Sequence, residues 1–141
     1  ALVPMLTRRV GAATSGCWLL AAQAVFVVGM ALATGPVGVV IAYVLTMSTH
    51  GAVNPVHQGL LHRAVTEPGL RATVLSTNSL AAMAGGTVGG IALGAIADAT
   101  SLTTAIIFGA GTLAGAAVLY LLVRTAPAPA VAAASPVRSQ A

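Results

Sequence analysis

Charged residues are scarce in this chain, and their scarcity excludes a water-soluble domain. Only 6% of the 141 residues are Asp, Glu, Lys or Arg, whereas a soluble globular domain carries about 25%. So few charges cannot cover a water-facing surface. We therefore expect lipid to surround the apolar residues, which make up 57% of the chain.

Lysine is absent, aromatic residues make up only 4%, and there is one cysteine. Cys17 lies in an apolar run, where it can form no intrachain disulfide and belongs to no metal-ligand cluster. The formal net charge of +4 does not indicate nucleic-acid binding. The six arginines stand singly or in one pair between long apolar runs, which is typical of charges that set membrane topology.

Four apolar runs are each long enough to cross a bilayer as an α-helix. A helix rises about 1.5 Å per residue, so about 20 residues cross a hydrocarbon core of about 30 Å. The runs show none of the period-two alternation of a membrane β-barrel. The predicted fold class is an all-α membrane protein with four transmembrane helices, at about residues 14–33, 37–53, 72–97 and 104–123.

The ends of these runs carry recognisable signals. Pro36 suits the first turn of the second helix, where its missing N–H is not needed, and Ser101 suits the N-cap of the fourth. Pro55 is expected to end the second span, so that residues 56–70 form a cytoplasmic connection. Residues 1–124 then form the membrane bundle, and residues 125–141, rich in Ala, Pro and Ser, a disordered cytoplasmic tail.

The arginines predict how the helices are oriented. Four alternating helices place all of them on one side of the bilayer, and the other side holds Asp98 without any arginine. The arginine side is expected to be cytoplasmic. Both ends of this chain then lie in the cytoplasm, and the protein lies in the plasma or inner membrane. The arginines are Arg8, Arg9, Arg63, Arg71, Arg124 and Arg138.

Residues 4–11 (PMLTRRVG), 71–76 (RATVLS) and 85–90 (GGTVGG) resemble segments of the major facilitator superfamily of transporters. Residues 4–11 (PMLTRRVG) place Leu6, Arg9 and Gly11 on the family's Gly-x-Leu-x-Asp-Arg-x-Gly loop, although its first Gly and its Asp are replaced. Residues 71–76 (RATVLS) resemble the start of the family's penultimate helix. Residues 85–90 (GGTVGG) match the frame of the Gly-Pro-x-x-Gly-Gly motif of its drug antiporters. As an alternative, the first segment is only a basic turn that sets topology.

The resemblance implies the last four helices of a twelve-helix carrier that works by alternating access. It further implies proton-coupled efflux of a drug or metabolite, no enzyme activity and no cofactor. The expected partners are the lipid bilayer, the missing N-terminal helices of the same carrier and a small-molecule substrate, but no nucleic acid.

One face of the second span carries a set of polar and polarisable side chains that we call the polar stripe. These residues recur at helical spacing, and polar groups facing lipid are costly, so the stripe is expected to border protein or the transport pathway. Histidine titrates near neutral pH and could exchange protons there. The alternative is interhelical hydrogen bonding without substrate contact. The stripe is Tyr43, Thr46, Met47, His50 and Asn54.

The third span adds one substrate-contact candidate, Asn78, near its cytoplasmic end. The third span also carries glycines that stand four residues apart in pairs, a spacing that allows a neighbouring helix to approach closely. They are Gly85, Gly86, Gly89, Gly90 and Gly94.

A metal site is not expected. His50 lies in the second run, whereas His57 and His62 lie in the connection that follows it. Pro55 should break the helical register between His50 and His57, and no Cys, Asp or Glu completes a ligand set.

Three other kinds of membrane protein are alternatives to a fragment of a carrier. An intramembrane hydrolase needs a nucleophile beside a base, and Ser48 and His50 lie on different faces of the helix. A four-helix exporter complete in itself usually centres on an intramembrane carboxylate, and these spans contain none. The main alternative is a small membrane scaffold or accessory subunit without transport activity of its own.

Overall fold

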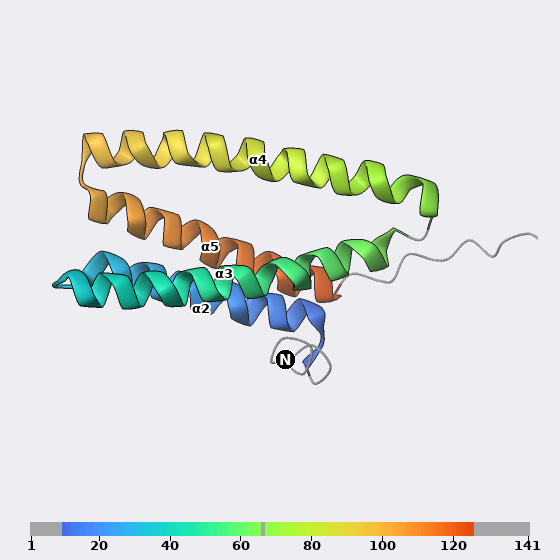
Figure 1. The fold of residues 1–141 in the computed structure, drawn as a ribbon, viewed down its shortest axis with the longest axis horizontal. Coiled ribbons are helices and arrows are strands. Elements are labelled where there is room, and N and C mark those ends of the chain that lie inside the picture. The colour runs from blue at the N-terminus through green and yellow to red at the C-terminus, as the bar shows by residue number, and fades with distance from the viewer. Residues whose placement is uncertain (1–9, 66, 126–141) are drawn as a thin grey trace, which may run out of the picture.

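The computed structural model describes residues 10–65 and 67–125, and it contains four long helices in this part of the chain (Figure 1). All four are long and apolar enough to cross a membrane, so the chain has the architecture of a multi-pass membrane protein. The helices are α2 (Ala12–Leu32), α3 (Pro36–Ala64), α4 (Pro68–Ala99) and α5 (Leu102–Thr125).

Successive helices run up and down (Figure 1). The start of α2, the end of α3, the start of α4 and the end of α5 lie at one end of the bundle. Arg63 and Arg71 therefore lie at the same end, and Asp98 lies near the turn at the other. Arg124 belongs to the last turn of α5, and Arg8 and Arg9 lie outside the described residues. We call the first of these ends the arginine end.

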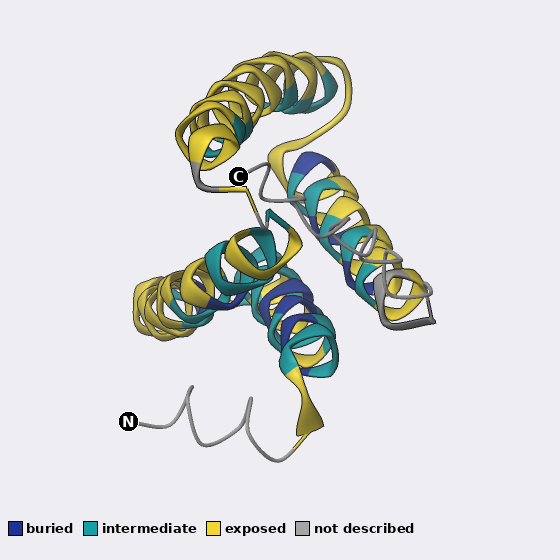
Figure 2. Cartoon of the chain, turned by 90° about the vertical axis from the view of Figure 1, so that its right-hand side faces the viewer, coloured by how far each residue is buried: buried dark blue, intermediate teal, exposed yellow. Residues whose placement is uncertain are grey.

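The central helix is α2, which packs against both α3 and α5 (Figure 2). Its buried residues include Ser15, Gly16 and Leu20, and α5 meets it with small residues such as Ala110 and Ala117. Helices in lipid gain nothing from hydrophobic exclusion of water, so close packing of small residues is a main source of their association. The core of the chain is therefore the three-helix group of α2, α3 and α5.

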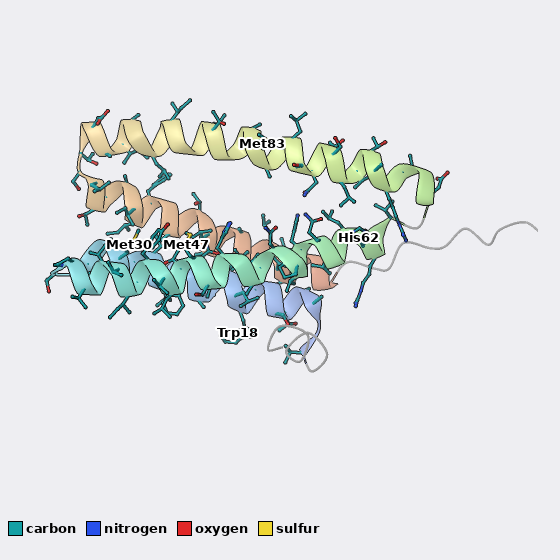
Figure 3. The ribbon with its side chains drawn as sticks, in the orientation of Figure 1. Trp18, Met30, Met47, His62 and Met83 are labelled. Carbon is teal, nitrogen blue, oxygen red and sulfur yellow. The ribbon has the colours of Figure 1, made fainter. Side chains whose placement is uncertain are left out.

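In contrast, α4 lies apart from this group and is exposed along nearly its whole length (Figure 2). Among the described helices, its one extended contact is with α5. The outer surface of the bundle is apolar: Trp18 on α2 is 68% exposed and Met83 on α4 is 70% exposed (Figure 3). Such a surface fits lipid rather than water.

The helix ends confirm two sequence predictions. Pro36 occupies the first turn of α3. The Ser101 hydroxyl accepts a hydrogen bond from the Thr104 backbone N–H at 3.1 Å, which is the N-cap bond expected for α5. Gly11 precedes α2 with φ of 86°, a backbone conformation that glycine adopts without the strain other residues incur.

The second helix is longer than predicted, and the expectation that Pro55 interrupts it was wrong. The helix α3 runs through Pro55 to Ala64, so only residues 65–67 separate it from α4. Proline is tolerated inside membrane helices because neighbouring groups and small local adjustments satisfy the freed carbonyl. The predicted tail lies outside the described residues from residue 126 onward.

Candidate functional site

The polar stripe lies on α3 and is only partly buried by the described residues. Thr46 is buried, and its hydroxyl donates to the Ala42 carbonyl at 2.8 Å. Tyr43 is 53% exposed, and His50 and Asn54 are exposed as well. The face of α3 that packs on α2 thus includes Thr46. The exposed members of the stripe lie next to this face on the helix surface.

Because α3 continues past Pro55, its polar face continues too. Positions 43, 47, 50, 54 and 57 follow one another by four or three residues and share one face of a continuous helix. His57 therefore belongs to the same face as His50. Sequence reasoning left it out because Pro55 was expected to break the register, although the spacing itself was visible.

A buried glutamine on α2 meets the middle of this face. Gln23 is only 6% exposed, and its Nε2 lies 3.4 Å from His50 Nδ1. An amide nitrogen can only donate, so Nδ1 accepts and the ring proton of a neutral His50 is on Nε2. The Gln23 Oε1 has no hydrogen-bond partner in the part of the chain that the structure describes. Leaving a buried acceptor unpaired costs about 1–3 kcal/mol, so this amide marks a position where the bundle accepts a stability cost.

Gln23 was missed at the sequence level, although a signal was there. It is the only side-chain amide in the first charge-free run. Polar groups within a membrane span are expensive and are often functional. Its neighbour could not be deduced, because the sequence does not show that Gln23 and His50 face each other across α2 and α3.

A second polar cluster, which we call the His57 cluster, joins three helices near the arginine end. His57 Nε2 lies 3.2 Å from Asn78 Oδ1 on α4, and His57 Nδ1 lies 3.1 Å from the Tyr120 hydroxyl on α5. The two rings also meet edge to face, with centroids 6.5 Å apart. Asn78 was a predicted site residue, whereas His57 and Tyr120 were not predicted as such.

The Tyr120 ring is fixed in place by close approach to α2. It lies directly over Gly16, where even a Cβ atom would overlap the ring. A cavity of about 310 Å³ adjoins this cluster, lined by apolar side chains and by the two rings. Its lining residues are His57, Leu60, Leu61, Ala64, Leu119 and Tyr120.

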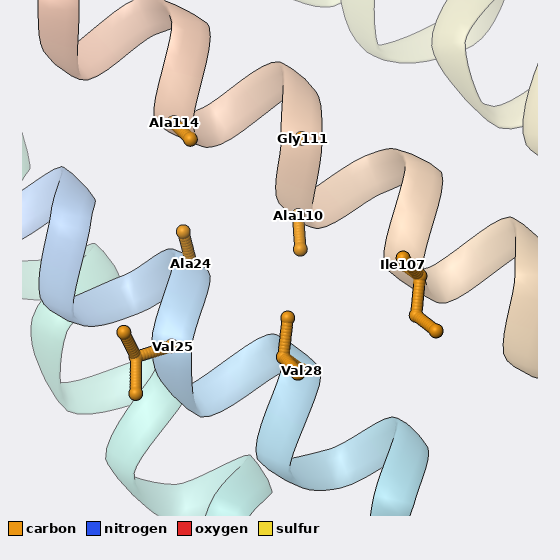
Figure 4. Close-up of a pocket in the computed structure, with 7 residues that line it drawn as sticks. All are labelled: Ala24, Val25, Val28, Ile107, Ala110, Gly111 and Ala114. Atoms are coloured by element: carbon orange, nitrogen blue, oxygen red, sulfur yellow. The ribbon is translucent and has the colours of Figure 1, made fainter.

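Another hollow, of about 400 Å³, lies between α2 and α5 (Figure 4). Every residue that lines it is apolar, including Ala24, Val28 and Ile107. A binding site normally adds a few polar groups that orient the ligand. This hollow offers only apolar contact and is therefore not a candidate for a polar substrate.

The glycine-rich face of α4 makes no close contact with the other described residues. Nothing lies within 4 Å of a Cβ built at Gly85, Gly86, Gly89, Gly90 or Gly94. The contact between α4 and α5 instead includes Gly109, whose Cβ position lies 3.5 Å from a methyl group of Leu93. Packing of the α4 glycines against another helix stays a prediction.

Among the described residues, no group of three or more His, Cys, Asp or Glu side chains is placed to hold a metal ion. The arginine Arg71 has a local contact: its Nε donates to the Val65 carbonyl at 3.3 Å and closes the short connection between α3 and α4.

Comparison with protein-family models finds no matching family. Comparisons with curated proteins and with solved structures find no match either.

Proposed function

We propose that this chain is part of a secondary carrier of the major facilitator type, which moves a small molecule across the cell membrane in exchange for protons. It is a carrier rather than an enzyme in this proposal, and efflux of a drug or metabolite is the expected direction. The arginine end lies in the cytoplasm, and the missing N-terminal helices of the same carrier complete the pathway.

The observation that carries the proposal is the uncovered polar face of α3. The exposed surface of the bundle is otherwise largely apolar, yet Tyr43, His50 and Asn54 are exposed on one side of a membrane-spanning helix. Polar side chains are unfavourable against lipid tails. This face therefore calls for a water-filled pathway or for further protein, and a carrier supplies both.

The pairing of His50 with Gln23 adds a group that could respond to protons. The imidazole is half of a polar pair between α2 and α3, and histidine is the side chain that changes charge most readily near neutral pH. In this proposal His50 takes up and releases the coupled proton. Tyr43, Met47 and Asn54 border the substrate, and Asn78 borders it from α4.

Accessibility of single cysteines tests the pathway. In a Cys17→Ala background, cysteines replace Tyr43, His50 or Asn54 in turn in the full-length gene product, and a membrane-impermeant thiol reagent is added to vesicles. We expect these positions to react quickly and to be protected by a transported substrate. Ile41→Cys and Val44→Cys, which are exposed on the same helix but lie off the polar face, should react slowly because they face lipid. If the cysteines on the polar face reacted as slowly as the lipid-facing ones, the proposal that this face borders a transport pathway would be wrong.

Proton coupling is tested by His50→Ala, with His62→Ala as the matched control on the same helix. Vesicles loaded with candidate drugs and metabolites report substrate movement and pH change together. His50→Ala should lose coupled proton movement, and His62→Ala should retain it. A parent protein that moves no compound of the panel would favour the accessory-subunit alternative.

A further inference from the structure

The helix α4 is attached to the rest of the bundle at few points. None of its residues from Gly69 to Ala99 is buried, and its extended contact is with α5 alone. The short turn at Thr100 and Ser101 connects it to α5 at one end. Near the other end, the hydrogen bond between Asn78 and His57 joins it to α3.

His57, the α3 side of this second attachment, is held in place by other helices. His57 also bonds to Tyr120, and the Tyr120 ring is seated against Gly16 of α2. The imidazole is therefore held by the three-helix group of α2, α3 and α5. Asn78 is the member of the cluster that α4 contributes.

The hydrogen bonds of the cluster define one arrangement of protons. The Asn78 oxygen can only accept, so His57 Nε2 carries a proton and donates it. In a neutral imidazole, Nδ1 then accepts from the Tyr120 hydroxyl. Both ring nitrogens have partners, so the ring is held in one orientation between α4 and α5.

We propose that the His57 cluster is a latch that holds the first part of α4 against α3 and α5. When the bond to Asn78 opens, α4 swings about the turn at Thr100 and Ser101. Apolar contact supplies little driving force between helices in lipid, and α4 has few close contacts to replace the lost bond. The latch goes beyond the proposed transport activity and does not require it, because it concerns only how the helices are held together.

Distances between spin labels on α3 and α4 test the latch in the full chain, reconstituted in phosphatidylcholine vesicles. In a Cys17→Ala background, labels are attached to Ser48→Cys on α3 and Ser79→Cys on α4, which are both exposed. His57→Ala should shift the distances between the labels to longer values and widen their distribution. Asn78→Ala removes only the bond to α4, leaves His57 on Tyr120, and should give the same change.

His62→Ala is the matched control, because His62 lies on the same helix and is exposed. Its distance distribution should superimpose on that of the parent. Tyr120→Phe keeps the ring over Gly16 and removes the hydroxyl, so it should give a smaller shift than His57→Ala. Unchanged distances in both His57→Ala and Asn78→Ala would overturn the latch, and so would an equal shift in His62→Ala.

Discussion

The helices α2 and α4 have similarly apolar sequences but opposite environments. The helix α2 is packed on two sides, by α3 and by α5, and buries residues such as Leu20 and Gln23. The helix α4 is longer, richer in glycine and open along its length. Small residues therefore do not by themselves bring helices together. Gly16 on α2 has a ring seated on it, whereas a Cβ added at the glycines of residues 85–94 on α4 would meet none of the described residues within 4 Å.

The largest expected difference between the two helices comes from adding bulk at their glycines. Gly16→Leu forces the Tyr120 ring from its seat and breaks the His57 cluster, and overpacking of this kind costs about 3 kcal/mol. At Gly90 on α4, an added Cβ has no described atom within 4 Å, so Gly90→Leu should change stability little. Thermal unfolding in detergent micelles measures both. A similar loss in the two variants would mean that the α4 glycines are packed after all.

Truncating a large side chain should also affect stability more in α2 than in α4. Leu20→Ala leaves a cavity beside buried neighbours and should cost about 2 kcal/mol, at the low end for core truncation because lipid replaces water around the unfolded helices. Leu80→Ala on α4 removes a side chain that is 69% exposed. Its cost should be much smaller in the same unfolding measurement. Equal costs would show that Leu80 is covered in the protein.

Replacing the two amide side chains, Gln23 on α2 and Asn78 on α4, should change stability in opposite directions. Gln23→Leu removes a buried oxygen that has no partner among the described residues. It also removes the Gln23–His50 contact, but that is a long bond of 3.4 Å to an exposed ring, so the variant should gain about 1 kcal/mol of stability. Asn78→Leu removes an oxygen that is bonded to His57 and should lower it. Chemical unfolding of both variants in mixed micelles checks the signs. A loss of stability in Gln23→Leu would show that its oxygen is satisfied.

The smallest effect is expected at the turn between α4 and α5. Ser101→Ala removes the bond to the Thr104 N–H and should cost about 0.5 kcal/mol, the low end for an exposed cap. Thr103→Ala is the matched control, because Thr103 is an exposed neighbour in the first turn of α5. The thermal midpoint should fall for Ser101→Ala only. Equal thermal midpoints in the two variants would show that the Ser101 cap does not stabilise this turn.

The sequence predicted the helices well because their determinants are local. The length of the apolar runs, Pro36 in a first turn and Ser101 at an N-cap act within a few residues of where they stand. The side-by-side arrangement of the arginine-bearing ends followed from alternation of the spans. Membership of the transporter family stays a prediction.

The candidate site was predicted less well, for two physical reasons. Pro55 was read as a helix end, which separated His57 from a face to which it belongs. Partners such as Gln23 for His50 and Tyr120 for His57 depend on how helices rotate against each other. That rotation is set by packing across helices, and the period of one sequence segment does not contain it.

The length of α4 has a consequence for the bilayer that can hold it. Its Arg71 and Asp98 are 27 residues apart, which is about 40 Å along a helix axis. A membrane with its headgroups is about 40–45 Å thick. An upright α4 thus places a cation and an anion in the two headgroup layers. In a thinner membrane the helix must tilt, so membrane thickness would set the inclination of the helix that is held least firmly.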